Sequence, residues 1–424
     1  MPQITAYTDD AVQVRTLSNG LTVTLETLPY LHSASAGVWI KTGSGNESAE
    51  QAGISHFLEH LFFKGTTTRS ARELMEAVEG GGGHLNAFTS RDHTCLYVRT
   101  LDTHLAIGLE ILADIVKNSQ FPDLEKERNV VLEEIASIED VPEDFVHDLL
   151  TLRLWPDHAF GRPITGDIET VSRLSLDDIR TYFREWYQPQ NLIISVAGNF
   201  EESAVFEQIA SEFESLVPGD GFRSSDRPQP RAGVERCLRD IAQNHIGLAF
   251  PGPDVNDPRR YAYDLLSSAL GGGSTSRLFD RIREKAGLVY SIYSFHSCYS
   301  KTGLLGLYSA VTPENLGTAL DMIYEELRKL RDEPLSSQEL ELNREQIKGG
   351  MLIALESTSN RMSRMAKSML YYGRIVPIEE TIAAIDAVTA DDLQTLAQEL
   401  FCPERCAGVI LGPETNGDVT QVQL

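Results

Sequence analysis

The chain has 424 residues, of which 42% are hydrophobic, and a formal net charge of −25 from 62 acidic and 37 basic residues. This length exceeds what one hydrophobic core usually supports, so two or more domains are expected. Such an acidic surface repels nucleic acid and anionic membranes, and no apolar run approaches the ~18 residues of a membrane span. We therefore expect neither a nucleic-acid partner nor a membrane anchor.

The compartment is predicted from the N-terminus and the cysteines. The stretch MPQITAYTDDAVQV has neither the basic and apolar regions of a signal peptide nor the arginine-rich character of a transit peptide. The five cysteines are scattered at Cys95, Cys237, Cys298, Cys402 and Cys406. Their odd number is typical of a reducing compartment, and no further Cys or His pair joins Cys402 and Cys406 in a zinc site. These features predict a cytoplasmic protein.

The strongest local motif is His56-Phe57-Leu58-Glu59-His60, which lies in an apolar stretch. Residues four apart lie on the same face of a helix, so His56 and His60 can reach one tetrahedral metal ion. Glu59 lies on the same side and can reach a water on that metal. The order inverts HExxH, and both orders are signatures of zinc hydrolases. A structural histidine pair is the alternative, but this spacing occurs once among the ten histidines.

A catalytic zinc site usually has three protein ligands, so one more is needed. The segment 123–141 is predicted to form an amphipathic helix. Its apolar side comprises Leu124, Val131, Ile135 and Ile138. Glu127 and Glu134 lie two turns apart on one face, and either could reach the metal, although exposed glutamates are also common on helices. We favour Glu134 as the ligand and Glu127 as the partner that orients a histidine ring, with Glu59 as the general base of amide hydrolysis.

An internal repeat divides the chain. The segments 181–200 and 395–414 align at an offset of 214, and each follows a Ser/Thr-x-Asp-Asp helix start. A stretch rich in Pro, Gly and Ser, which is typical of an exposed linker, lies between the halves. We therefore predict two homologous domains, 1–217 and 235–424, joined by a linker at 218–234. Alternating strands and long helices predict an α+β fold in which a sheet packs against helices.

The repeat also provides an internal comparison for the metal motif. Shifting the HFLEH motif by 210 to 214 residues leads into 266–274, which contains neither His nor Glu. The same shift carries Glu134 to Lys348. The second half is therefore expected to fold like the first without metal-binding residues, which favours a functional role for the motif over a structural one.

These motifs resemble those of the pitrilysin/insulinase superfamily of zinc peptidases. The resemblance rests on HFLEH followed by LFFKGT, a distal glutamate in VVLEEI, and the duplication, and it covers about 15–415. The most similar subgroup is the mitochondrial processing peptidase with its short bacterial relatives. The resemblance implies one Zn²⁺ per chain, bound by His56, His60 and Glu134, with Glu59 as the general base. Manganese or cobalt would suit the same ligands.

Two further segments carry the resemblance. In HLNAFTS the family holds an extended peptide along an edge strand, which implies substrate contacts at Asn86 and Ala87. Read alone, this segment would be a glycine turn that enters an ordinary strand. In the second half, REKAGLVY implies that Arg283 and Tyr290 stabilise the substrate and the developing oxyanion. Read alone, Arg283 would be a surface charge, and the preceding GGGS lacks the Lys-Ser/Thr of a phosphate-binding loop.

The resemblance thus implies a zinc endopeptidase that hydrolyses short or unfolded peptides in an enclosed chamber. Larger relatives close a clamshell of four such domains, so two copies of this chain, as a homodimer, would complete one. Arg283 and Tyr290 of one protomer would then face the zinc of the other. A non-catalytic structural or peptide-binding subunit and the catalytic subunit of an obligate heterodimer are the alternatives. The intact metal-binding and Arg/Tyr residues argue against both.

Overall fold

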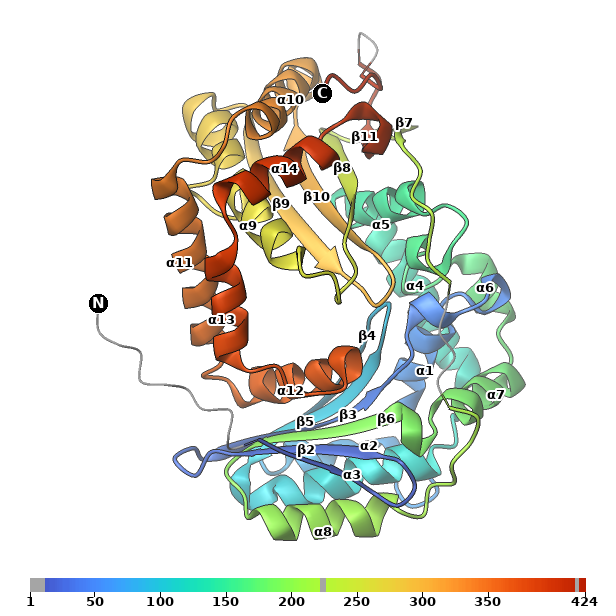
Figure 1. Cartoon of the computed structure of the whole chain (residues 1–424). Helices are drawn as coiled ribbons and strands as arrows, with labels where there is room; N and C mark the ends of the chain where they lie inside the picture. Colours follow the sequence, from blue (N-terminus) through green and yellow to red (C-terminus); the bar gives the residue numbers. More distant parts are fainter. Residues whose placement is uncertain (1–11, 222–225, 416–418) are drawn as a thin grey trace. The chain divides into compact units, whose positions relative to one another are not determined.

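The computed structural model describes residues 12–221, 226–415 and 419–424 (Figure 1). Internal contacts divide these residues into two compact units. The first unit is formed by the described residues within Met1–Ile135, Pro163–Ser225 and Leu352–Glu379. The second is formed by those within Ala136–Arg162, Asp226–Met351 and Glu380–Leu424. The units differ from the sequential halves 1–217 and 235–424, because a helical segment of each half packs in the unit of the other.

The first unit contains a six-stranded sheet with the order β1-β2-β6-β3-β5-β4. Its strands are β1 (Val12–Thr16), β2 (Thr22–Thr27), β3 (Ser33–Ile40), β4 (His84–Thr89), β5 (Thr94–Leu101) and β6 (Leu192–Gly198). Strands β2 and β6 pair in parallel, and the other neighbours pair antiparallel. Central strands β3 and β6 are buried almost throughout, whereas the edge strand β4 alternates between exposed and buried residues. The centre of the sheet is therefore covered on both faces, as its nearly unbroken apolar runs require.

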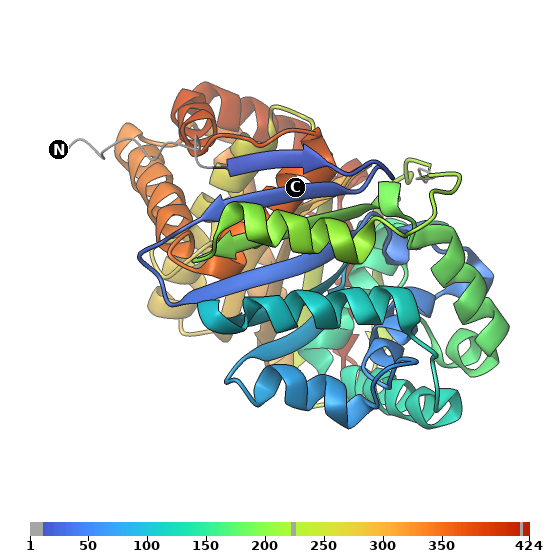
Figure 2. The same cartoon turned by 90° about the horizontal axis from the view of Figure 1, so that it is seen from below.

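Helices cover both faces of this sheet (Figures 1 and 2). The helices of the unit are α1 (Ile54–Phe62), α2 (Ala71–Glu79), α3 (Leu105–Asn118), α4 (Leu124–Asp140, which continues into the second unit), α6 (Ile168–Arg173), α7 (Leu176–Trp186), α8 (Glu202–Phe213) and α12 (Thr358–Tyr372). Figure 2 shows α2, α3 and α8 along one face, and α12 packs on the opposite face against β3 and β6. Trp39 Nε1 donates to Met362 Sδ at 3.1 Å, and Arg361 pairs with Glu26, so α12 is fixed to the sheet by polar as well as apolar contacts.

The second unit repeats this design with a five-stranded sheet of order β7-β11-β8-β10-β9. Its strands are β7 (Gly233–Leu238), β8 (Asn244–Gly252), β9 (Val289–Cys298), β10 (Gly303–Val311) and β11 (Ala407–Gly412). Its helices are α5 (Pro142–Leu154), α9 (Arg260–Gly271), α10 (Leu316–Asp332), α11 (Ser337–Ala354, which ends in the first unit), α13 (Ile378–Ala387, which begins in the first unit) and α14 (Ala390–Leu400). Apart from β1, the strand order and the single parallel pair match those of the first sheet. The predicted α+β duplication is confirmed.

The predicted helix starts of the repeat are also confirmed. Ser175 Oγ accepts from the backbone nitrogen of Asp178 at 3.2 Å, and the Asp178 carboxylate accepts from the backbone of Ser175 at 2.8 Å. Thr389 and Asp392 form the same pair of bonds at 3.1 and 2.8 Å. These reciprocal bonds satisfy backbone donors that the first helical turn leaves unpaired. The Ser/Thr-x-Asp-Asp pattern therefore begins the corresponding helices α7 and α14.

The predicted linker 218–234 lies between α8 and the second sheet. Residues 222–225 lie outside the described residues, and β7 begins within the predicted range at Gly233.

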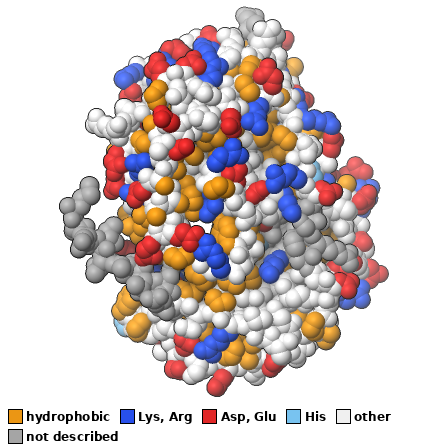
Figure 3. Space-filling view, viewed as in Figure 1, with side chains coloured by type: hydrophobic (Ala, Val, Ile, Leu, Met, Phe, Trp, Pro, Cys, Tyr) orange, Lys and Arg blue, Asp and Glu red, His pale blue; other side chains and the backbone are white. Residues whose placement is uncertain are grey.

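On the face shown in Figure 3, Lys and Arg side chains lie among Asp and Glu. Within the described parts of the chain, the helices are all too short or too polar to cross a membrane.

Candidate metal centre

Helix α1 carries the HFLEH motif, and its start is tightly specified. Gly53 has φ 88°, in the left-handed region that favours glycine, and a Cβ there would lie 2.5 Å from the Thr165 carbonyl oxygen. The buried carboxylate of Glu47 accepts hydrogen bonds from the backbone nitrogens of Gly53 at 2.8 Å and Ser55 at 2.9 Å. It caps the helix from outside and complements the positive end of the helix dipole.

The packing of α1 determines where its polar residues lie. The apolar residues that it buries are Ile54, Phe57, Leu58, Leu61 and Phe62. The remaining face carries His56, Glu59 and His60, as their spacing along a helix predicts. His56 is 8% exposed, so its ring lies in the wall of the site, whereas Glu59 and His60 are half-buried. The apolar packing therefore holds the motif on the side of α1 that α4 approaches.

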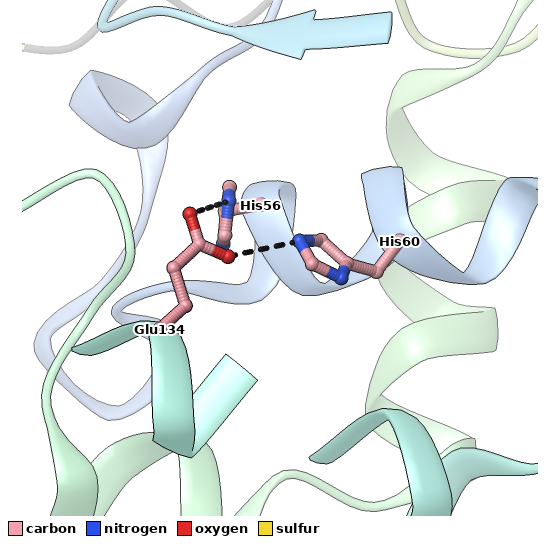
Figure 4. Close-up of side chains that lie close together, drawn as sticks. All are labelled: His56, His60 and Glu134. Atoms are coloured by element: carbon pink, nitrogen blue, oxygen red, sulfur yellow. Dashed lines mark ion pairs between the residues drawn. The ribbon is translucent and has the colours of Figure 1, made fainter. Parts of the chain in front are cut away.

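Glu134 of α4 lies between the two imidazoles (Figure 4). Its Oε1 is 3.5 Å from His56 Nε2, and its Oε2 is 3.2 Å from His60 Nε2. One donor atom from each of the three residues lies within 4.8 Å of the others. Ligands of a tetrahedral zinc ion at ~2.0–2.1 Å are separated by about 3.4 Å. The donor set and its spacing thus fit zinc, and such a group occurs nowhere else among the described residues.

The charges of the site favour a cation. Burial lowers the pKa of His56, but contact with the Glu134 carboxylate outweighs it, with smaller contributions from Glu59 and Glu47, and the net shift is upward. Contacts with His56 and His60 hold the pKa of Glu134 far below its usual range. Glu134 is therefore ionised at neutral pH, and protons compete with a metal ion for His56.

Glu127 lies seven residues before Glu134 on α4, and its carboxylate pairs with Lys64. Its side chain is 3% exposed, and its Oε2 lies 2.9 Å from Lys64 Nζ and 3.9 Å from His60 Nδ1. The second distance is too long for a hydrogen bond. Glu127, predicted to orient a histidine ring, lies beside His60 without a hydrogen bond to it and forms its ion pair with Lys64. Sequence reasoning missed Lys64, although it lies four residues after His60, one further turn along the chain.

The other predicted residues of the first unit lie on β4. Asn86 is exposed and Ala87 is 7% exposed, and Asn86 Oδ1 accepts from the backbone nitrogen of Ala87 at 2.8 Å. At the end of the strand, Thr89 Oγ1 donates to Glu59 Oε2 at 2.7 Å. The sequence analysis missed this contact. The one feature of the sequence that points to it is that side chains alternate along a strand, which turns the Thr89 hydroxyl toward the inner face of the sheet.

Arg283 and Tyr290 belong to the second unit. Arg283 lies in a π-helical segment, Phe279–Lys285, and its guanidinium is 5.1 Å from the centroid of the Tyr290 ring. Tyr290, near the start of β9, is 82% exposed. The structure thus brings the predicted pair together. In the same unit, Lys348 of α11 replaces Glu134 of the repeat and lies 2.8 Å from Asp386.

Comparisons with known proteins match the chain to two family models. Residues 22–168 match the family described as insulinase (peptidase family M16), and residues 173–347 match the peptidase M16 inactive domain. The chain is 40% identical over 407 residues to the uncharacterized zinc protease YmxG of Bacillus subtilis, covering 95% of this chain and 98% of the relative. It is 37% identical over 409 residues to an uncharacterized zinc protease of Mycobacterium tuberculosis, covering 94% and 92%.

Solved structures show the same fold. A protease from Helicobacter pylori is similar with a TM-score of 0.89 and 25% identity, covering 95% of this chain and 99% of that one. A Pseudomonas fluorescens structure described as a peptidase M16 inactive domain is similar with a TM-score of 0.89 and 19% identity, covering 96% and 99%. At 19% identity, the similarity to the Pseudomonas fluorescens structure shows only that the fold is shared. Both extend over the two units and so include the predicted duplication.

Proposed function

Because the chain belongs to the insulinase (M16) family of peptidases, we propose that it is a zinc-dependent endopeptidase that hydrolyses short or unfolded peptides. Its relatives are named as zinc proteases, which supports a metallopeptidase. The observation that carries the finer proposal is the arrangement of α1 and α4. His56, His60 and Glu134 offer three donor atoms at the separations of zinc ligands, and Glu59 lies on the same face of α1.

In this proposal each residue has one role. Zinc held by His56, His60 and Glu134 would polarise the scissile carbonyl and increase the acidity of the attacking water. The Glu59 carboxylate would take a proton from that water and later pass it to the leaving nitrogen. Peptide hydrolysis then balances, because water supplies the hydroxyl of the new carboxylate and the proton of the new amine.

The edge strand β4 supports a peptide as the substrate. It pairs with β5 on one side and ends its sheet on the other. An extended peptide can add to such an edge through backbone hydrogen bonds, which favours unfolded chains over folded proteins. The exposed Asn86 side chain and the backbone of Ala87 are the proposed contacts. An enclosed chamber would strengthen this selection by size.

We also propose that two copies of the chain form a homodimer with two composite sites. Arg283 and Tyr290 lie side by side in the second unit, and Tyr290 is 82% exposed. A large exposed ring beside a guanidinium suits contact with a peptide or with the negative charge that develops on its carbonyl. In the homodimer, this pair of one protomer would act at the metal centre of the other.

A second candidate function is a non-catalytic peptide-binding or structural subunit. The match of 173–347 to an inactive domain raises this possibility for the second half. The metal-centre residues all lie in 22–168, within the match to the insulinase family. Their close approach in the first unit favours catalysis for the whole chain. A third possibility, an obligate heterodimer, predicts that the single chain alone is inactive.

The test uses the purified full chain, its metal content by mass spectrometry and a quenched peptide library. We expect wild type to hold one zinc ion per chain and to cleave peptides. Glu59→Gln should keep zinc and lose at least ~100-fold in kcat, since its amide cannot take a proton. Glu134→Gln should lose zinc and activity, whereas the neighbouring Glu133→Gln should keep both. Unchanged activity in Glu59→Gln would overturn the assigned base. Zinc binding without cleavage by wild type would favour the second or third possibility.

A further inference from the structure

We infer that Thr89 is a positioning residue that fixes the Glu59 carboxylate from the strand on which the substrate is proposed to bind. The inference rests on the proposed function and extends it by connecting β4 to the general base. The observation that carries it is the 2.7 Å hydrogen bond from Thr89 Oγ1 to Glu59 Oε2.

The alternation of β4 explains why this hydroxyl reaches the site. Leu85 and Ala87 are buried, whereas His84, Asn86 and Phe88 are exposed. Thr89 is the next residue in the inward-facing row, and α1 packs against the same strand. An inward hydroxyl requires a hydrogen-bond partner, and at this position Glu59 provides it.

The hydrogen bond restricts the general base to one orientation. A glutamate side chain has three rotatable bonds before its carboxylate, and a half-buried one retains much of that freedom unless it is held. Thr89 holds one oxygen, Oε2, and approaches within 3.5 Å of the Ser55 carbonyl at the base of the same helical turn. The second oxygen, Oε1, is left for proton transfer. A hydroxyl-to-carboxylate bond of this length is among the stronger protein hydrogen bonds.

The position of Thr89 connects the two parts of the proposed reaction. Asn86, Ala87 and Thr89 belong to one strand, and β4 is fixed in register by β5, with Thr89 opposite Thr94. A peptide paired along the outer edge of β4 is therefore aligned by the same strand that aligns Glu59. This arrangement sets the scissile bond and the base relative to each other, and small misplacements there reduce the rate strongly.

The test compares Thr89→Val, Thr89→Ser and a matched control, Thr94→Val. Valine keeps the shape of threonine and removes the hydroxyl, whereas serine restores it. Thr94 lies opposite Thr89, and its hydroxyl donates to the Thr42 carbonyl at 3.0 Å rather than to Glu59. Thr94→Val therefore measures the cost of losing a buried hydroxyl from the same strand pair.

We expect Thr89→Val to lower kcat about 10-fold or more, with KM changed less than about twofold. Thr89→Ser should recover most of kcat, and Thr94→Val should keep it. Zinc affinity by chelator competition, and the visible spectrum of the cobalt-substituted protein, should match wild type in all three. Equal kcat in Thr89→Val and Thr94→Val would overturn the inference. So would weakened zinc binding in Thr89→Val, since the residue would then act on the metal centre as a whole. Inactive wild type, or active Glu59→Gln, would instead contradict the proposed function.

Discussion

The carboxylate of Glu47 lies 2.8 Å from the backbone nitrogen of Gly53 and caps α1 from the preceding loop. We predict that Glu47→Ala lowers the free energy of unfolding by about 2 kcal/mol, because two buried backbone donors lose their acceptor. Zinc affinity should fall as well, since His56 lies in the first turn of this helix. Chemical denaturation and chelator competition would measure the two effects.

The control for Glu47 is Glu73, which caps α2 at an exposed position. Its carboxylate accepts from the backbone nitrogen of Ser70 at 2.8 Å. Glu73→Ala should cost less stability, because water replaces the lost bond, and should leave zinc affinity at the wild-type value. If both variants change zinc affinity equally, the capping role of Glu47 at the metal centre is wrong.

The ion pair of Lys64 with Glu127 provides a second prediction. Lys64→Met should destabilise the fold by about 2 kcal/mol, because a carboxylate that is 3% exposed loses its cation. Glu127→Gln should lower zinc affinity by less than about 10-fold, because its carboxylate lies 3.9 Å from His60 Nδ1 and acts on the ring through its charge, without a hydrogen bond. The double variant Lys64→Met/Glu127→Gln should lose less free energy of unfolding than the sum of the two single losses, because it leaves no unpaired charge.

A more exposed ion pair serves as the comparison for the single and double variants of Lys64 and Glu127. Lys117 lies 2.9 Å from Glu212, and both side chains are about a quarter exposed, at 24% and 27%. Lys117→Met should cost less than about 1 kcal/mol, because water solvates the remaining carboxylate. A coupling energy for Lys64 and Glu127 that is no larger than that of Lys117 and Glu212 would contradict the assigned role.

The sequence predicted those parts of the site that follow from helical spacing. HFLEH on one helix determines the face that His56, Glu59 and His60 share, because all lie within one turn of each other. Spacing could not choose between Glu127 and Glu134, since both lie on one face of α4. The glutamate that binds the metal is the one that lies next to the imidazoles of α1, and the packing of α4 against α1 determines which one that is.

The contacts that sequence reasoning missed are those made by tertiary packing. Glu47 precedes its helix by a loop, and Thr89 reaches Glu59 across 30 residues of chain. The exchange of α5 and α12 between the units was missed for the same reason. Periodicity predicts which face of a helix is apolar, but not which of two similar sheets that face covers.

The proposed homodimer predicts complementation between two inactive variants. Glu59→Gln and Arg283→Ala should each be inactive, yet a mixture that exchanges subunits should recover about a quarter of wild-type activity. Half of the dimers would be mixed, and one of the two sites in each would have both residues intact. Size-exclusion with light scattering should report a dimer for each variant.

The matched control for complementation mixes Glu59→Gln with Glu134→Gln. Both changes lie at the metal centre of the first unit, so no composite site in the mixed dimer would be intact. This mixture should remain inactive. If the mixture with Arg283→Ala also stays inactive although subunits exchange, the composite site is wrong.

The last prediction concerns His93, which is 4% exposed and packs beside Trp39 and Phe88. Burial, with a smaller contribution from the Lys367 charge, lowers its pKa to about 3. The neutral ring is therefore the folded form, while the unfolded chain takes up a proton below its ordinary pKa of about 6.5. Stability from this group is complete above pH 6.5 and declines as the pH falls, by about 1.4 kcal/mol per unit.

The measurement is the free energy of unfolding of the zinc-free protein between pH 7.5 and 5. Below pH 6.5, the slope of the free energy of unfolding against pH should be smaller in His93→Gln than in wild type by the contribution of about one proton. The reason is that no imidazole remains at this position to be protonated on unfolding. The zinc-free protein is required, since acid also displaces metal from His56 and His60. A slope in His93→Gln equal to that of wild type would show that His93 is protonated in the folded protein.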